Sequence, residues 1–457
     1  MRCIMKSNFQ TLLTIKRLGI NGEGIGYYKR KAVFVDGAIP EEEIICEFIK
    51  EEDNYIQGKV VKIKKPSKDR VEAPCPYFGR CGGCQLQHIK YESQLKFKRE
   101  IIVHSLERYL TKYDQLNIDI KEMIGMDKPY YYRNKAQMPV ANEGRNVVTG
   151  LYEANTNHLV YIDTCIIQNE FINNTLDIIK VLLSKHHIMA YNRKTRSGNL
   201  RYVSVRYMEN TKECQVVLVL KDKHMTNISK LAEELMTKVK EVVSFYVNIN
   251  PDISSHEIYG EEFIHIRGKK TIEALIKDIK FTISPHSFYQ LNTKQTEVLY
   301  DVVKQLANLK KTDKVIDSYC GIGTISLFIA RDVAEVRGVD ITEQAIKDAR
   351  NNASLNNITN AYFEAGHAET IIPKWIKEGF KPDCIIMDPP RTGIDDKLLS
   401  VLKRVKVKKL IYVSCNPSTL AKDLNELTKV YNIEVIQPVD MFPQTSHVET
   451  MVLMSRV

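Results

Sequence analysis

No apolar run in this sequence approaches the roughly 18 residues that a membrane-spanning helix needs. The opening stretch MRCIMKSNFQ also lacks the apolar core of a secretory signal peptide. Internal repeats and low-complexity segments are missing as well, which excludes solenoids and other repeat architectures. We therefore expect a globular protein of the cytoplasm that has no membrane partner.

The ten cysteines are too few for a disulfide-stapled scaffold in a chain of 457 residues. A chain of this length is expected to form two to four domains, because domains typically hold roughly 100–200 residues. The formal net charge is +10 at pH 7 and 27% of the residues are charged, so the basic excess is moderate. This balance favours a polyanionic partner such as a nucleic acid.

Residues 1–66 alternate short β-rich runs with glycine-containing turns, as in NGEGIGYY and KAVFVDGAIP. Short strands between turn signals are typical of a small β-barrel, which we expect over this range. The last run continues into a basic stretch, which forms either a solvated surface or a contact with phosphates. The basic residues of this stretch are Lys59, Lys62, Lys64, Lys65, Lys68 and Arg70.

Within residues 67–285, the stretch from about 120 to 285 is dominated by segments that alternate apolar and polar side chains. The segment NLRYVSVRYMENTKECQVVLVLK predicts two strands that flank a turn around Glu209 and Asn210. We expect a mainly antiparallel α+β domain here. From residue 286 to 457 strands alternate with helices, beginning with a helix capped by Asn292, which predicts a doubly wound, Rossmann-like α/β domain with a parallel sheet.

A glycine turn links the first strand of this α/β domain to its first helix, in KVIDSYCGIGTISLFIA. The second strand ends at Asp340, whose carboxylate could accept hydrogen bonds from ribose hydroxyls. Ser326 stands where the dinucleotide-binding fingerprint requires a third glycine. The pattern therefore favours S-adenosylmethionine over NAD, because S-adenosylmethionine has no pyrophosphate to place on the helix N-terminus.

Two further strands end in chemically active side chains. The strand in PDCIIMDPPRTG ends at Asp388, and the strand in KLIYVSCNPSTL ends at Cys415 before an Asn-Pro turn. Because α/β sheets bind ligands at the carboxyl ends of their strands, we expect a thiol, two acids and the glycine turn to line one crevice. An isolated cysteine is usually a small core residue, but these neighbours argue for a functional thiol.

A thiol in such a crevice suits methylation of C5 of a pyrimidine, because that carbon becomes nucleophilic once a thiolate has added to C6. The reaction then requires a base to remove the C5 proton. Glu449 in SHVETMVLM is the preferred candidate, since burial can raise the pKa of a carboxyl group into the working range. His447, expected on the same face of the strand, is the alternative. A base within folded RNA must also be flipped out, and Phe288 could receive it.

A separate group of cysteines has the spacing of metal ligands. Cys75, Cys81 and Cys84 form a C-x5-C-G-G-C pattern, and Cys165 could complete a set of four. Four thiolates suit either zinc or an iron–sulfur cluster, and unligated cysteines remain a third interpretation. The remaining cysteines, Cys3, Cys46, Cys214, Cys320 and Cys384, have no such spacing.

With these motifs assembled, the chain resembles the RNA uracil-5-methyltransferase family, specifically the bacterial 23S rRNA (uracil-5-)-methyltransferases of the RumA type. The resemblance covers nearly the whole chain and rests on C-x5-C-G-G-C, FYQLN, DSYCGIGTISL, GVD, DPPR, SCNP and HVETM. It implies that residues 1–66 form an OB-like TRAM domain. It also implies a class I methyltransferase domain at the C-terminus and a monomer that acts on RNA, 23S rRNA in particular.

The resemblance also implies roles for particular residues. Cys415 would be the nucleophile and Glu449 the base. A [4Fe–4S] cluster would be held by Cys75, Cys81, Cys84 and Cys165, and S-adenosylmethionine would be contacted by Gln290, Tyr319, Asp340 and Asp388. The family often has Phe and Glu where Tyr319 and Asp340 stand, which preserves a ring and a carboxylate. By similarity, Arg133, Asn134 and Lys135 would face RNA, although a solvated loop is an equal interpretation.

Several other functions remain as alternatives. A tRNA uracil-5-methyltransferase is one alternative, because the barrel and the cluster favour rRNA only by resemblance. An RNA cytosine-5-methyltransferase uses the same thiol addition but resembles its relatives in carrying a Cys directly after Pro at the fourth strand, where this chain has Asp-Pro-Pro-Arg. An amino-methyltransferase would need an aromatic residue after the prolines and no Cys415. An iron–sulfur redox or RNA-binding module would keep its activity without that thiol.

Overall fold

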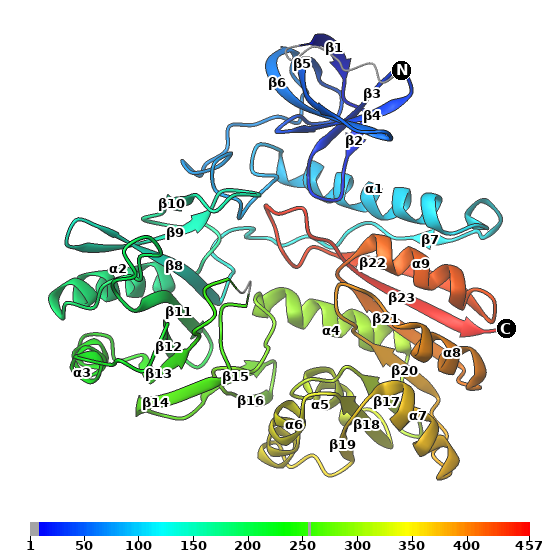
Figure 1. The fold of residues 1–457 in the computed structure, drawn as a ribbon. Helices are drawn as coiled ribbons and strands as arrows, with labels where there is room; N and C mark the ends of the chain where they lie inside the picture. Colours follow the sequence, from blue (N-terminus) through cyan, green and yellow to red (C-terminus); the bar gives the residue numbers. More distant parts are fainter. Residues whose placement is uncertain (1–8, 255–256) are drawn as a thin grey trace. The chain divides into compact units, whose positions relative to one another are not determined.

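The computed structural model describes residues 9–254 and 257–457 (Figure 1). Cys3 and nearly all of the opening stretch considered for a signal peptide lie outside the described residues. The chain forms two compact units. The first unit joins Met1–Pro129 to Asp388–Val457, and the second is Tyr130–Met387. The division into residues 1–66, 67–285 and 286–457 stays a prediction.

The N-terminal part of the first unit is a sheet with strand order β1-β5-β6-β4-β3-β2. Its strands match the β-rich runs expected from the sequence. They pair antiparallel except β4 and β6, which pair in parallel. The bounds are β1 (Gln10–Thr14), β2 (Arg17–Leu18), β3 (Gly24–Tyr28), β4 (Lys31–Asp36), β5 (Glu43–Glu51) and β6 (Tyr55–Lys65).

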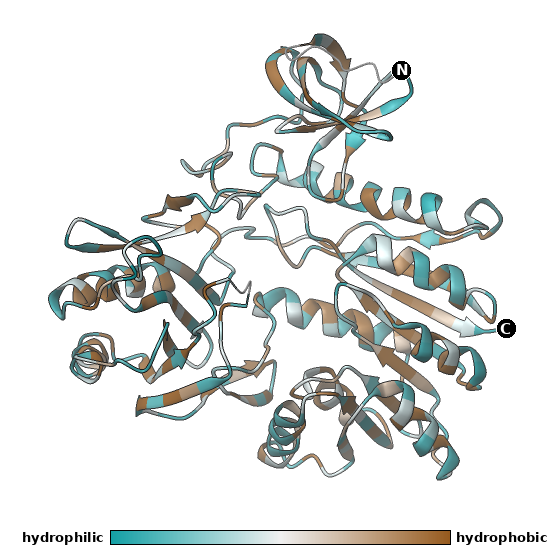
Figure 2. Ribbon diagram, in the orientation of Figure 1, coloured by the Kyte–Doolittle hydropathy of each residue, from teal (hydrophilic) through white to brown (hydrophobic). Residues whose placement is uncertain are grey.

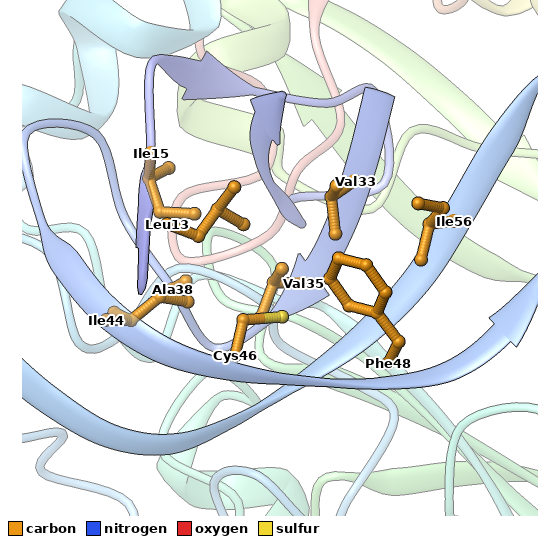
Figure 3. Packing of buried hydrophobic residues seen from close by; sticks show 9 residues of the cluster. All are labelled: Leu13, Ile15, Val33, Val35, Ala38, Ile44, Cys46, Phe48 and Ile56. Atoms are coloured by element: carbon orange, nitrogen blue, oxygen red, sulfur yellow. The ribbon is translucent and has the colours of Figure 1, made fainter. Parts of the chain in front are cut away.

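Apolar side chains from β1, β4, β5, β6 and the adjoining loops pack together in this sheet (Figure 3). The cluster consists of Leu13, Ile15, Val33, Val35, Ala38, Ile44, Cys46, Phe48 and Ile56. Removing this much apolar surface from water is the main force that holds so small a sheet together. Cys46 is thus a core residue, in agreement with its lack of metal-ligand spacing.

The remainder of the first unit combines helices with a sheet of order β21-β23-β22-β7. Helix α1 packs against helix α9. β23 runs antiparallel to both β21 and β22, so the expectation of a parallel sheet is wrong for the C-terminal strands. The bounds are α1 (Tyr91–Tyr109), η1 (Tyr113–Gln115), β7 (Asp119–Ile120), α8 (Asp396–Arg404), β21 (Lys409–Ser414), α9 (Pro417–Leu427), β22 (Tyr431–Val439) and β23 (Glu449–Arg456).

The second unit begins with a sheet of order β10-β9-β8-β11-β12-β13-β14, in which β12 and β13 pair in parallel and the other pairs are antiparallel. The hairpin expected around Glu209 and Asn210 joins β11 to β12, and the mainly antiparallel prediction is confirmed. The bounds are β8 (Lys135–Glu143), β9 (Asn146–Tyr152), β10 (Leu159–Tyr161), α2 (Glu170–Lys185), β11 (Leu200–Met208), β12 (Glu213–Leu220), α3 (Ile228–Lys238), β13 (Val242–Ile249) and β14 (Glu262–Gly268).

The rest of the second unit holds the hairpin β15–β16 and parallel strands in the order β19-β18-β17-β20. Asn292 caps helix α4 by accepting from the N–H of Gln295, as the sequence predicts. The bounds are β15 (Ile272–Ile276), β16 (Ile279–Ile283), α4 (Thr293–Ala307), β17 (Lys314–Ser318), α5 (Thr324–Ala330), β18 (Glu335–Asp340), α6 (Glu343–Leu355), β19 (Ala361–Ala365), α7 (Ala368–Lys377) and β20 (Cys384–Met387).

Hydropathy follows this arrangement. In Figure 2 the strands β20 and β21 are mostly brown, whereas helix α1 alternates teal and brown along its length. An alternating helix is typical of one face packed on the core and one face in water. Among the described residues, none of the helices combines the length and apolar character that crossing a membrane requires.

Candidate active site

The thiol of Cys415 lies between the end of a buried strand and the start of a helix. β21 ends at Ser414, and α9 begins at Pro417. Asn416 caps the helix by accepting from the N–H of Ser418 at 3.1 Å, and proline at the first helical position needs no hydrogen-bond acceptor. The turn expected after Cys415 is therefore a helix start, which fixes the thiol at a rigid strand exit.

The sheet places Glu449 beside that exit. Ser414 and Thr450 are paired across the antiparallel strands β21 and β23. Cys415 directly follows one member of this pair and Glu449 directly precedes the other, so the two side chains occupy the next positions at the same end of the ladder. Glu449 is buried, with 9% of its surface exposed.

Asp388 and Arg391 complete the surroundings of the thiol within the first unit. The negative charge of Asp388 acts on both Cys415 and Glu449, and the positive charge of Arg391 opposes it at both groups. The Arg391 carbonyl accepts from the Nδ2 of Asn416 at 2.9 Å. The loop after Asp388 is thereby fastened to the residue that follows the thiol.

The titration of these groups is set mainly by burial. Burial raises the pKa of the Cys415 thiol to about 11, and the charges of Glu449 and Asp388 act in the same direction. Burial also raises the pKa of Glu449 well above the ordinary range for a carboxyl group, with a further contribution from Asp388. The pKa of Asp388 is raised to about 7, again by burial. Strongly perturbed groups of this kind are typical of sites that transfer protons.

The sequence suggested that His447 shares a strand face with Glu449, but the structure places His447 outside the strand. It precedes β23, its side chain is exposed, and its Nε2 lies 3.4 Å from a guanidinium nitrogen of Arg391. The alternation on which that expectation rested begins only at Glu449. Burial of the carboxyl group makes Glu449 the better match to a proton-transfer role.

The glycine turn of the second unit has the geometry of a ligand site. Asp340 accepts from the backbone N–H of Gly321 at 3.0 Å and of Thr342 at 2.8 Å. A Cβ at Gly321 would meet no described heavy atom within 4 Å, so a ligand can approach the backbone there. Tyr319 has a left-handed backbone with φ of 66° and is partly exposed beside this turn.

Ser326, which replaces a third glycine, has a structural partner. Its backbone N–H and hydroxyl both donate to Oδ2 of the buried Asp317, at 2.9 and 2.5 Å. This carboxylate joins the end of β17 to the first turn of α5. Gln290 is also in the second unit, where its carbonyl accepts from Nδ2 of Asn134 at 2.9 Å. That Gln290, Tyr319 and Asp340 share one crevice with Cys415 stays a prediction.

The cysteines with metal-ligand spacing differ from the core cysteines in exposure. Cys75, Cys81 and Cys84 are partly exposed in the first unit, and Cys165 is partly exposed in the second. Sγ of Cys81 accepts from the N–H of Gly83 at 3.3 Å. Within residues 9–254 and 257–457, however, no three His, Cys, Asp or Glu side chains gather closely enough to hold a metal ion.

Two participants in the thiol site were not assigned a role from the sequence. Arg391 followed the prolines of a recognised motif, but its charge at the thiol depends on where the loop folds. Asn416 was treated as part of a turn, whereas it caps α9 and binds the Arg391 carbonyl. The only signal for Asn416 was its place before proline, which is also a common helix start.

Comparison with known proteins identifies relatives over nearly the whole chain. The family model tRNA (Uracil-5-)-methyltransferase matches residues 90–457. A protein named as an RNA methyltransferase from Bacillus cereus is 44% identical over 97% of this chain and 96% of its own length. A protein with the same description from Halalkalibacterium halodurans is 46% identical, over 99% of this chain and 97% of its own.

A solved structure of an RNA uracil-5-methyltransferase is also similar to this chain. The tRNA (uracil-54, C5)-methyltransferase of Pyrococcus abyssi, in complex with S-adenosyl-L-homocysteine, is similar with a TM-score of 0.76 and 28% identity. The similarity covers 97% of this chain and all of the archaeal one. The chain belongs to the tRNA (uracil-5-)-methyltransferase family, and RNA (uracil-5-)-methyltransferase is its enzyme class.

Proposed function

We propose that this chain transfers a methyl group from S-adenosylmethionine to C5 of uridine in RNA, through a covalent bond between Cys415 and C6 of the base. The observation that carries the proposal is the placement of a thiol and a buried carboxyl group at one end of the β21–β23 ladder. Asp388 and Arg391 supply charges of opposite sign to both groups.

The reaction begins with the thiol. With a pKa of about 11, Cys415 is mostly protonated at neutral pH, so a neighbouring carboxylate must take its proton as sulfur attacks C6. Of the two carboxyl groups whose charges act on the thiol, Asp388 takes this proton and returns it when the thiolate is released, because Glu449 must stay unprotonated to accept the C5 proton. The guanidinium of Arg391 favours the thiolate. Formation of the S–C6 bond gives C5 the character of an enolate carbon.

The second half of the reaction needs a base. S-adenosylmethionine supplies an electrophilic methyl group to C5 and leaves as S-adenosylhomocysteine. Glu449 then removes the C5 proton, the C5–C6 double bond re-forms, and the S–C6 bond breaks to release Cys415. A carboxyl group with a raised pKa holds the abstracted proton more firmly than an ordinary one, which suits it to this step.

We propose that S-adenosylmethionine is contacted by Gln290, Tyr319, Asp340 and Asp388. The open space above Gly321 supports this assignment, because it leaves room for a ligand against the backbone. The Asp340 carboxylate can accept hydrogen bonds from ribose hydroxyls while its oxygens stay oriented by two backbone N–H groups. The bound product in the Pyrococcus abyssi structure also supports it.

The RNA substrate is proposed to be 23S rRNA, on the family resemblance of the motifs. tRNA is the second candidate, because the similar Pyrococcus abyssi enzyme is named for a tRNA position. Phe288, with 72% of its surface exposed, could stack on a flipped base. Arg133, Asn134 and Lys135 are proposed as RNA contacts by similarity alone, because burial, together with the charges of Arg206 and Arg133, lowers the pKa of Lys135 to about 6.

We further propose that a [4Fe–4S] cluster is held by Cys75, Cys81, Cys84 and Cys165. The C-x5-C-G-G-C spacing and the partial exposure of all four thiols support the assignment. The described side chains are not gathered into a metal site, so the assignment rests on the spacing and exposure of the thiols. Loading the protein with iron and sulfide should give the visible absorption of a cluster, and replacing Cys84 with Ala should abolish it.

The proposed function is tested with RNA that contains 5-fluorouridine. Fluorine at C5 leaves no proton for Glu449 to remove, so the reaction should stop with RNA bonded to Cys415. We expect 23S rRNA, and not tRNA, to give a complex that survives denaturing electrophoresis with the wild-type protein. The Cys415→Ala variant should give none and should have no measurable methyl transfer.

The matched control is Cys214→Ala, a buried cysteine of strand β12 that should keep both the complex and the activity. Nucleoside mass spectrometry should find 5-methyluridine in ordinary RNA. Methylation of cytosine alone, or full activity of Cys415→Ala, would contradict the proposal. A covalent complex with tRNA and none with rRNA would change the proposed substrate to tRNA and leave the proposed reaction unchanged.

A further inference from the structure

Gln444 has a backbone conformation that side-chain-bearing residues seldom adopt. Its φ is 70°, in the left-handed region that favours glycine, and only 1% of its surface is exposed. It lies in the segment that connects β22 to β23, residues 440–448, which we call the base loop because Glu449 follows it directly. Such strain persists only where surrounding contacts enforce it, and it tends to cluster at functional sites.

The contacts that hold Gln444 use both its backbone and its side chain. Its carbonyl accepts from the N–H groups of Gln85 and Leu86, at 3.1 and 3.0 Å. Its own N–H donates to Oε1 of Gln94 at 3.2 Å, and its Oε1 accepts from Nε2 of Gln94 at 3.0 Å. The two glutamines therefore form a reciprocal, buried amide pair that ties the base loop to helix α1.

Gln94 is itself fixed in place. It is 1% exposed, and its Nε2 also lies within donor distance of the carbonyls of Leu86, at 3.1 Å, and Ile89, at 2.9 Å. Buried amides with several partners have little freedom to rotate. The pair thus connects the base loop to an element that cannot easily move.

The two ends of the base loop are also fastened. At its start, Asp440 accepts from Nζ of Lys98 at 2.7 Å and from the hydroxyl of Tyr91 at 2.9 Å, and the Lys98–Asp440 ion pair is fully buried. Near its end, the N–H of Ser446 donates to Oε1 of Gln85 at 3.3 Å. The loop is therefore held at its start, its middle and its end by α1 and the residues just before it.

We propose that Gln444 is a positioning residue for Glu449, acting through its amide pair with Gln94. This inference rests on the proposed function, in which Glu449 removes the C5 proton. The base loop delivers the chain into β23 at Glu449, so a displacement of the loop displaces the carboxyl group at the start of the strand. Proton abstraction depends steeply on such a displacement, whereas thiol addition from Cys415, directly after β21, does not use the base loop.

The segment that carries the clustered cysteines enters the same network. Gln85 directly follows Cys84, and it contacts the base loop through both its backbone N–H and its side chain. The position of the base is consequently tied to the end of the cysteine segment, through the protein's own hydrogen bonds.

The test compares proton removal with the earlier steps. In the Gln444→Gly variant the left-handed backbone is unstrained and its backbone hydrogen bonds can form, but the amide pair is lost. We expect kcat to fall roughly ten- to a hundred-fold with KM for RNA unchanged. Because methyl transfer precedes proton removal, RNA carrying a labelled methyl group should accumulate as a covalent complex with the enzyme on a denaturing gel.

A second variant and a control separate positioning from folding. Gln444→Asn tolerates the left-handed backbone but its shorter amide cannot reach Gln94, so it should behave like Gln444→Gly. Gln437→Ala on β22, whose amide binds the carbonyl of Glu122, should show wild-type kcat and no accumulation. Urea unfolding should find Gln444→Gly about as stable as the wild type, a result that separates a kinetic defect from loss of the fold.

The outcomes distinguish this inference from the function on which it rests. Glu449→Gln must accumulate the same methylated complex. If it does and Gln444→Gly turns over like the wild type with no accumulation, the positioning role of Gln444 is refuted and the proposed function stands. If Glu449→Gln loses turnover without any accumulation, the assigned base is wrong and the inference falls with it.

Discussion

Carboxyl groups at strand ends have different surroundings in the two units. In the second unit, Asp340 is held by hydrogen bonds from the backbone of Gly321 and Thr342. In the first unit, burial raises the pKa of Asp388 and of Glu449, and within the described residues no hydrogen bond to either carboxyl group lowers it. Similar groups thus have different electrostatic surroundings.

In the proposed function, this difference separates binding from proton transfer. A carboxylate that accepts backbone hydrogen bonds is stabilised in its charged form and keeps its oxygens oriented, as recognition of a hydroxyl requires. A buried carboxyl group without such donors exchanges its proton closer to neutral pH, as a general base requires. The strand end alone does not specify the role; the donors around it do.

The largest expected effect is that of replacing Glu449 with Gln. Turnover should fall roughly a hundred- to ten-thousand-fold, because general base catalysis contributes about that much. The affinity for S-adenosylmethionine, measured by calorimetry, should stay within about twofold of the wild type. If Glu449→Gln loses affinity for S-adenosylmethionine together with turnover, Glu449 belongs to the cofactor site and the contrast between the two units fails.

An intermediate effect is expected for Asp340→Ala. The dissociation constant for S-adenosylmethionine should rise roughly ten- to a hundred-fold, because hydrogen bonds to a charged group contribute about 1.5–3 kcal/mol. At saturating cofactor kcat should remain near the wild-type value. Asp340→Glu is the matched control and should bind nearly normally, since it keeps a carboxylate. A large loss of kcat in Asp340→Ala would place this residue among the catalytic groups instead.

The third expected effect is a dependence of stability on pH. The folded-state pKa of Asp388 is about 7, above its ordinary value of 3.8, so the folded protein binds the proton more tightly than the unfolded chain. This contribution to stability is complete below about pH 4 and is lost as pH rises towards 7. The Asp388→Asn variant has no such loss.

Urea unfolding without cofactor should therefore show Asp388→Asn gaining stability relative to the wild type between pH 5 and pH 8. The gain should be at most about 1.4 kcal/mol for each unit by which the pKa is raised. Replacing Asp396, an exposed residue in the first turn of α8, with Asn provides the control. A difference that stays constant across this pH range would mean that burial does not perturb Asp388.

Local pattern was sufficient to predict much of this fold. The N-terminal strands, the β11–β12 hairpin and the capped start of α4 depend on residues near one another in sequence, and each is observed. The same holds for the strand ends at Asp340, Asp388 and Cys415. Periodicity and turn residues specify such features because the interactions are short in range.

Features that depend on distant segments could not be predicted in this way. β23 inserts antiparallel between β21 and β22, and nothing in its alternation distinguishes that placement from a parallel one. The sequence does not distinguish Gln444 from other glutamines, because its pairing with Gln94 forms only in the folded chain. The charge of Arg391 at the thiol likewise arises from loop placement.

The first unit is assembled from two stretches of chain that are separated by the whole of the second unit. During synthesis, Lys98 and Gln94 must remain in water until Asp440 and Gln444 have emerged, since their buried partners do not yet exist. The second unit, being continuous, can fold while these groups wait. If translation pauses after the second unit, at Met387, the polar groups on the buried face of α1 still lack their partners. Chaperones that bind nascent helices would then bind this face.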